Sequence, residues 1–141
     1  MDLALLTGQR PADVLKLRCT DIRDGALWIV QNKTGARLGI EVTGELATVV
    51  ARISARPRRA ISPYLIQDEN GQPVSQLALR SRFDRARVLA KVSFQFRDIR
   101  AKAATDTGDL AHSQKLLAHK NRDMTEQYVR ARIGERVRPL R

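Results

Sequence analysis

The chain has 141 residues, with 26 Lys and Arg against 15 Asp and Glu, and a formal net charge of +11 at pH 7. Its length fits one domain, and its hydrophobic share of 43% is that of a folded protein. A single cysteine, Cys19, excludes an internal disulfide and a zinc site built from cysteines, and no apolar run approaches the roughly 18 residues that cross a membrane. We therefore expect a soluble, intracellular domain that binds a polyanion, of which nucleic acid is the commonest. Ribosomal, regulatory and enzymatic functions all remain open at this level.

The first half of the chain is expected to hold a β-hairpin between helices. The expected elements are an apolar helix that Thr7-Gly8 ends, a helix from Pro11 to Arg18, strands at 26–30 and 37–42, and a helix over about 44–55. The first strand is continuously apolar, as in a strand covered on both faces, whereas the second alternates. Between the strands, residues 31–35 have the polar, glycine-containing chemistry of a hairpin turn, so we expect Lys33 at or beside a β-turn.

The second half is expected to be helical after a loop-rich middle. A short third strand is predicted at Tyr64–Ile66, and Trp28, Tyr64 and Phe83 have the character of core residues. The expected helices are one capped by Ser75 with an apolar face of Leu79, Phe83, Ala86 and Ala90, then 96–105, 113–117 and 123–130, followed by a basic tail over 130–141. The fold class is therefore α+β: a mainly helical single domain with a small antiparallel β-sheet.

Seven polar side chains in four clusters could carry chemistry. They are, in chain order, Arg10 with Asp13, Lys33 in the expected turn, Arg97 with Arg100, and His119 with Tyr128. The first and third clusters have i, i+3 spacing, which puts both side chains on one helix face. In isolation each cluster is more often a solvated ion pair, a basic face or a packed side chain than a catalytic group.

Taken together, these side chains suit phosphoryl transfer. Arginines can offset charge on the transition-state oxygens, and a tyrosine hydroxyl can attack phosphorus to give a covalent intermediate. A lysine can protonate the leaving oxygen. Side chains then supply the cations, so no metal or other cofactor is expected, and the sequence has no carboxylate cluster typical of a magnesium site.

Five segments, in order and at suitable spacing, resemble the catalytic domain of the tyrosine recombinases, the phage-integrase family. They are the first-arginine box at Thr7–Leu17, the hairpin lysine in Asn32–Gly35, the His-x-x-Arg box at Phe96–Thr105, the Leu-Leu-Gly-His box at Leu116–His119, and the nucleophile box at Met124–Val129. Each segment alone is a weak signal. The five together cover nearly the whole chain and imply the family's DNA breaking-rejoining fold.

The resemblance also implies a role for each residue that matches the family's catalytic set. Tyr128 attacks the scissile phosphate, forms a 3′-phosphotyrosyl bond and releases a 5′-hydroxyl. Arg10 and Arg100 bind the non-bridging oxygens of the phosphate, and Lys33 is the general acid that protonates the 5′-oxygen. The implied partner is double-stranded DNA, on which the family assembles as tetramers, in the cytoplasm of a bacterial or phage-infected cell.

Two further roles and two departures follow from the same comparison. His119 assists through a hydrogen bond to the phosphate, and Asp13 orients Arg10 without contacting the phosphate itself. Arg97 stands where the family most often has histidine; a guanidinium can donate to phosphate but cannot act as a base. Ala118 replaces the usual glycine, which matters only where the backbone needs a positive φ.

The resemblance further implies domains that this sequence does not contain. Family members carry an N-terminal core-binding domain, so we expect residues 1–141 to be a single catalytic domain, truncated at its N-terminus. Such a fragment is expected to bind DNA weakly and to recombine poorly. Two alternatives stay open: a decayed integrase that only binds DNA, and an RNA-binding protein, against which the aromatic content of 4% argues.

Overall fold

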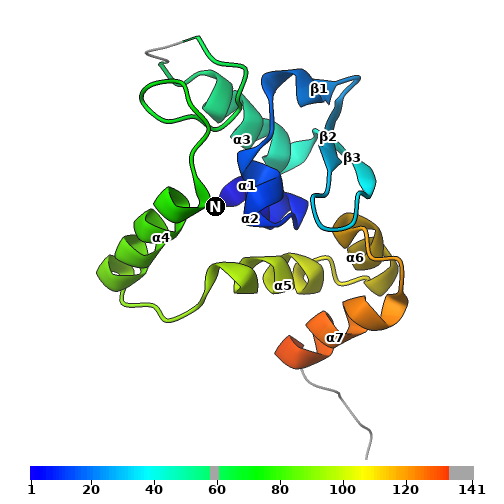
Figure 1. Cartoon of the computed structure of the whole chain (residues 1–141). Coiled ribbons are helices and arrows are strands. Elements are labelled where there is room, and N and C mark those ends of the chain that lie inside the picture. Colours follow the sequence, from blue (N-terminus) through cyan, green and yellow to red (C-terminus); the bar gives the residue numbers. More distant parts are fainter. Residues whose placement is uncertain (58–60, 134–141) are drawn as a thin grey trace, which may run out of the picture.

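The protein is a mainly helical domain with one small sheet, described here from a computed structural model that covers residues 1–57 and 61–133 (Figure 1). The predicted basic tail lies, from residue 134 on, outside the described residues. The elements are α1 (Asp2–Thr7), α2 (Pro11–Leu15), the 3₁₀ helix η1 (Cys19–Asp21), β1 (Ile22–Arg23), β2 (Ala26–Val30), β3 (Arg37–Glu41), α3 (Gly44–Ser54), α4 (Gln76–Ala90), α5 (Phe96–Asp106), α6 (Leu110–Leu117) and α7 (Arg122–Ile133). Over the described part of the chain, no helix combines the length and apolar character that a membrane span needs.

The sheet is antiparallel with strand order β1-β2-β3, and its hairpin is the one predicted. The turn is closed by Gln31 N–H donating to Ala36 O (2.9 Å) and Gly35 N–H donating to Gln31 O (2.8 Å), so Lys33 lies in the turn. The prediction of a third strand at Tyr64–Ile66 is wrong. Tyr64 forms only an isolated bridge with Arg18, because the chain enters η1 directly afterwards and offers no extended partner.

Only one face of the sheet is covered. Leu27 and Ile29 are buried, whereas Trp28 is 40% and Val30 50% exposed, so the expectation of a strand covered on both faces is wrong. The helices pack on one side, and the other side of β2 meets solvent. Trp28 is thus no core residue; its ring lies over Gly39, where a Cβ would come within 3.1 Å of it, and the Arg23 guanidinium stacks 5.5 Å from its centroid.

The core lies between the inner sheet face and the helices α1, α2 and α3. Its buried members are Leu3, Ala4, Val14, Leu17, Leu27, Ile29, Leu46, Val49, Val50, Leu65, Phe83 and Ile99. Helix α1 packs against both α3 and α5, and α5 packs in turn against α6 and α7. Figure 1 shows α1 and α2 at the centre of the molecule, with α5 beneath them and α6 and α7 beside its end. This arrangement brings the two halves of the chain together.

Helix α4 extends away from this core (Figure 1), and its predicted apolar face is only partly buried. Phe83 is buried and makes edge-to-face contacts with Phe94 and Phe96, at 5.6 and 5.1 Å between ring centroids. Ala86 and Ala90, predicted on the same face, are exposed because no element of the described chain covers the second half of this helix. Tyr64, the third predicted core aromatic, is half-buried.

Candidate active site

A left-handed turn between α1 and α2 begins the site. Gly8 has φ +63° there, and a Cβ on it would lie 3.0 Å from Leu117 Cδ2 and 3.4 Å from Leu116 Cγ. Glycine is therefore required both by the backbone and by the close approach of the end of α6. The turn places Arg10 at the start of α2 and points the Gly8 carbonyl toward the guanidinium of Arg100, which donates to it.

Asp13 lies beside Arg10, at the i, i+3 spacing, and also binds the hairpin. Its carboxylate is 1% exposed and lies 4.0 Å from Arg10 Nη1 and 3.6 Å from Lys16 Nζ. It accepts a hydrogen bond from the backbone N–H of Asn32 (2.7 Å) at the start of the turn. Lys16 in turn donates to Val30 O and to the Asn32 side chain. The helix that carries Arg10 and the turn that carries Lys33 are thereby joined.

Arg100 occupies the centre of the site and is 6% exposed. It lies on α5, whose start is set by a capping box in which Gln95 N–H donates to Asp98 Oδ2 (2.7 Å). Its Nη2 donates to Leu117 O (2.9 Å). Burial, and then the charge of Arg10, lower the pKa of Arg100 to about 10, against the opposing influence of Tyr128. The guanidinium thus stays charged at pH 7.

Helix α6 ends in a second left-handed turn, which presents His119. The N–H of Ala118 donates to Lys115 O and that of His119 to Gln114 O, both at 3.0 Å, which are the two bonds of a Schellman motif. Ala118 has φ +51°, a region that alanine adopts only with strain. This is the position where the family has glycine, so the departure at Ala118 carries a conformational cost.

Replacing Ala118 with glycine should therefore stabilise the protein. The change removes the strain of a left-handed alanine, which is about 1–2 kcal/mol. Glycine also raises the backbone entropy of the unfolded chain, which offsets part of this, so the free energy of unfolding should rise by a net amount of about 0.5–1 kcal/mol. Urea unfolding measures the difference. Ala86→Gly, in the exposed middle of α4, is the matched control and should lose about 1 kcal/mol instead. Equal losses in both variants would contradict the strain at Ala118.

His119 is buried between Thr125 and Arg100 and is neutral at pH 7. Its Nδ1 lies 3.0 Å from Thr125 Oγ1 and its Nε2 3.3 Å from Nη2 of Arg100. Because a guanidinium only donates, Nε2 must accept, which assigns the ring proton to Nδ1. Burial, then the charges of Arg100 and Arg10, lower the pKa of His119 to about 4.

This pKa makes stability depend on acidity. An unfolded histidine has a pKa of about 6.5, so the unfolded chain binds the proton first as the pH falls. Neutral His119 makes its full contribution to the free energy of unfolding above about pH 6.5. That contribution falls as the pH is lowered to about 4, by up to about 3 kcal/mol. When the free energy of unfolding is measured in urea between pH 7 and 4.5, its slope against pH should be shallower for His119→Gln than for wild type. His112→Gln, which changes the exposed histidine, should keep the wild-type slope; equal slopes in both variants would contradict this assignment.

Tyr128, on α7, joins the same group of side chains. It is half-buried, and its ring centroid lies 5.6 Å from that of His119 with the planes tilted by 30°. The proximity of Tyr128 to Arg100 opposes the lowering of the Arg100 pKa by burial. Arg10, Arg100, His119 and Tyr128 are therefore brought together from four separate segments.

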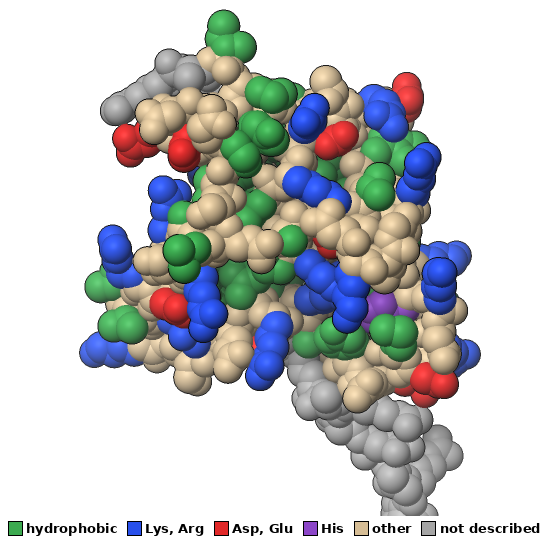
Figure 2. Space-filling model, viewed as in Figure 1, with side chains coloured by type: hydrophobic (Ala, Val, Ile, Leu, Met, Phe, Trp, Pro, Cys, Tyr) green, Lys and Arg blue, Asp and Glu red, His purple; other side chains and the backbone are tan. Residues whose placement is uncertain are grey.

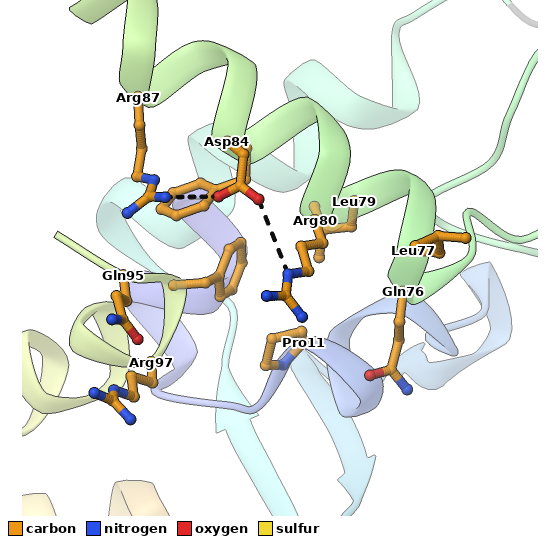
Figure 3. A pocket seen from close by; sticks show the side chains of 11 residues that line it. Pro11, Gln76, Leu77, Leu79, Arg80, Asp84, Arg87, Gln95 and Arg97 are labelled. Carbon is orange, nitrogen blue, oxygen red and sulfur yellow. Dashed lines mark hydrogen bonds and ion pairs between the residues drawn. The ribbon is translucent and has the colours of Figure 1, made fainter. Parts of the chain in front are cut away.

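Lys33 and Arg97 are not part of this group. Lys33 is exposed in the hairpin turn and pairs with none of the described residues. Arg97 is exposed one helical turn before Arg100 and lines a groove of about 640 Å³ between α4 and α5, together with Pro11 and Gln95. Figure 3 shows Arg97 on the α5 side of this groove, across from Arg80, which is paired with Asp84 on α4.

Buried polar residues around the site were missed by the sequence reasoning. They are Thr7, Gln9, Gln31, Ser113 and Thr125. The available signal was that Gln9 adjoins Arg10 and that Gln31 directly follows an apolar strand. Burial of these side chains depends on contacts between distant segments, and hence it cannot be read from local periodicity.

The surface around the site is basic, as the net charge predicted. Figure 2 shows Lys and Arg side chains spread over this face, with a group of them beside a histidine where α2 lies above α5. A surface of this sign attracts the phosphates of a nucleic acid.

The chain belongs to the phage integrase family, whose sequence pattern matches residues 1–134. It is 33% identical, over 96% of its own length, to the integrase of Escherichia phage HK022, and 31% identical, over 91%, to the prophage integrase IntE of Escherichia coli (strain K12). The chain spans only 41% and 39% of the length of these two relatives.

Solved structures agree with this assignment. A lambda integrase dimer bound to a COC′ core site superposes with a TM-score of 0.81 at 25% identity, over 98% of this chain and 53% of that one. The lambda integrase catalytic core gives a TM-score of 0.71 at 25% identity, over 84% of this chain and 76% of that one. The predicted α+β, mainly helical fold is thereby confirmed as that of an integrase catalytic core.

Proposed function

We propose that this chain is the catalytic domain of a tyrosine-type site-specific DNA recombinase, which cleaves and rejoins DNA through a 3′-phosphotyrosyl intermediate. The observation that carries the proposal is the convergence of Arg10, Arg100, His119 and Tyr128 in one site. A tyrosine hydroxyl supplies the nucleophile and two arginines supply the donors to the phosphate oxygens, which are the groups that transesterification at a phosphodiester needs. Such convergence favours an active enzyme over a decayed integrase that only binds DNA.

The reaction follows from the chemistry of each side chain. The Tyr128 hydroxyl oxygen attacks phosphorus, and the bond from phosphorus to the 5′-oxygen breaks. Arg10 and Arg100 donate to the non-bridging oxygens and offset their developing charge. Lys33, whose side chain is exposed in the hairpin turn, gives a proton to the departing 5′-oxygen. Rejoining is the reverse, with a 5′-hydroxyl attacking the phosphotyrosine.

The proton of the phenol also needs an acceptor. A guanidinium only donates hydrogen bonds, so Arg97 in the position of the family's histidine removes one candidate base. Nε2 of His119 already accepts from Arg100, and burial lowers the pKa of this imidazole to about 4, so His119 is also a poor base; we propose that the phenol proton passes to solvent water. Arg97, exposed at the groove between α4 and α5, is assigned to contact the DNA phosphates instead.

The partners and location proposed here rest on the relatives. Lambda integrase has been solved as a dimer bound to a COC′ core site and as a tetramer bound to a Holliday junction. We infer double-stranded DNA as the substrate of this chain, self-association on that DNA, and a cytoplasmic location in a bacterial host.

A covalent-adduct assay tests this function. Nicked duplexes from the source genome, labelled at the 3′-phosphate side, are incubated with protein and run on a denaturing gel, with a native gel to record binding. We expect a slow, protein-linked band that persists in EDTA, because side chains supply the charge that a metal would otherwise provide. DNA binding without an adduct would favour the decayed integrase, and an adduct that strictly requires Mg²⁺ would indicate a different class of enzyme.

A further inference from the structure

Two buried glutamines lie between the segments that carry the proposed catalytic groups. Gln9 and Gln31 are each 1% exposed, and Gln31 Nε2 donates to Gln9 Oε1 at 2.7 Å. Gln9 immediately precedes Arg10, whereas Gln31 begins the hairpin turn. Buried amides must satisfy all their polar atoms within the protein, so their partners define what they hold in place.

The side chain of Gln31 forms all four hydrogen bonds that an amide can make. Its Oε1 accepts from Arg10 Nη1 (3.4 Å) and from the Thr34 hydroxyl (2.8 Å). Its Nε2 donates to Gln9 and to Leu117 O (3.0 Å). Arg10 can only donate and the Leu117 carbonyl can only accept, so the orientation of the amide is fixed at both ends.

The side-chain hydrogen bonds of Gln9 and Gln31 form a relay between these segments. Its Gln9 end reaches the residues before His119. Gln9 Nε2 donates to Thr7 O (2.9 Å) and to Leu116 O (2.8 Å). The carbonyl of Leu117, which Gln31 binds, also accepts from Arg100. The glutamine pair therefore connects the turn before Arg10, the hairpin turn and the end of α6 through side-chain contacts alone.

Lys33 is anchored through its neighbours rather than through its own side chain. Asn32, before it, is bound through its backbone N–H to Asp13 (2.7 Å), and Thr34, after it, is bound to Gln31. The ammonium stays free to move while the backbone that carries it is held on both sides. Of these two anchors, Gln31 is the one that also contacts Arg10 and the end of α6.

We propose that Gln31 is a positioning residue that sets the hairpin turn, and with it Lys33, against the phosphate-binding arginines. This inference rests on the proposed recombinase function. Loss of the amide should misplace the general acid and slow the departure of the 5′-oxygen, while DNA binding changes little because Gln31 is buried.

The test compares two leaving groups. Gln31→Met keeps the length of the side chain and removes its hydrogen bonds, and Thr34→Val removes only the exposed end of the relay. Single-turnover adduct formation is measured on ordinary DNA and on DNA with sulfur in place of the bridging 5′-oxygen. A thiolate leaves without a proton, so a defect in general-acid positioning should largely disappear on the sulfur substrate.

For Gln31→Met we expect a loss of about 10–100-fold on ordinary DNA, the usual cost of removing a partner that orients a reacting group, and near-wild-type rates with sulfur. Thr34→Val should show a smaller loss with the same relief. Gln67→Met, the same change outside the site, should match wild type on both substrates. Wild-type rates for Gln31→Met on ordinary DNA, or an equal loss on both substrates, would overturn the inference.

Hydrogen exchange separates this inference from the proposed function. If wild type forms no adduct on either substrate, the proposed function fails, and exchange of the amides over 32–36 and 116–119 still tests the positioning. Gln31→Met should exchange faster in both segments than Gln67→Met does. Unchanged exchange there would show that the glutamine holds neither segment.

Discussion

Replacing Tyr128 with phenylalanine is expected to abolish the covalent protein–DNA adduct and to leave DNA affinity nearly unchanged. Phenylalanine lacks only the hydroxyl oxygen that attacks phosphorus, and no other side chain of the site carries a hydroxyl at that position. The aromatic ring, which packs beside that of His119, is retained. Binding depends on the basic surface, which the substitution does not alter.

Wild type and Tyr128→Phe are compared on denaturing gels for the adduct and on native gels for binding. Tyr64→Phe is the matched control, because Tyr64 lies beside Arg18, outside the site, at 5.7 Å from its guanidinium to the ring centroid. That variant should form the adduct at the wild-type level. An adduct that survives in Tyr128→Phe would refute the assignment of the nucleophile.

Replacing Arg100 with glutamine should impair both cleavage and folding. A preorganised donor aimed at a transition-state oxygen contributes about 10²–10³ in rate, so adduct formation should fall by that factor. The same guanidinium bonds the carbonyls of Gly8 and Leu117 inside the protein. Leaving such buried acceptors poorly satisfied costs about 1–3 kcal/mol, so the free energy of unfolding should fall as well.

Single-turnover cleavage and urea unfolding measure the two effects separately. Arg97→Gln is the control for stability, because Arg97 lies on the same helix with the same chemistry but is exposed. Its free energy of unfolding should stay at the wild-type value. An Arg100→Gln variant that unfolds and cleaves like wild type would remove Arg100 from the proposed site.

Local sequence patterns determined most of the elements and the list of candidate residues. Apolar periodicity and turn chemistry located the hairpin and the helices at 44–54 and 96–106 to within a residue of their observed ends. These features arise from contacts close along the chain, which a sequence displays directly. The family resemblance likewise selected the candidate site residues, of which the structure brings Arg10, Arg100, His119 and Tyr128 together and leaves Lys33 and Arg97 outside that group.

Only the tertiary structure decided which faces are covered and how the site is held. An apolar run cannot show that Trp28 faces solvent, nor a helical stripe that Ala86 is left exposed, because burial depends on what packs against each face. The left-handed backbone at Ala118 follows from how α6 ends against the site. The relay through Gln31 joins residues far apart in the chain, and such long-range hydrogen bonds exist only after the two halves have packed together.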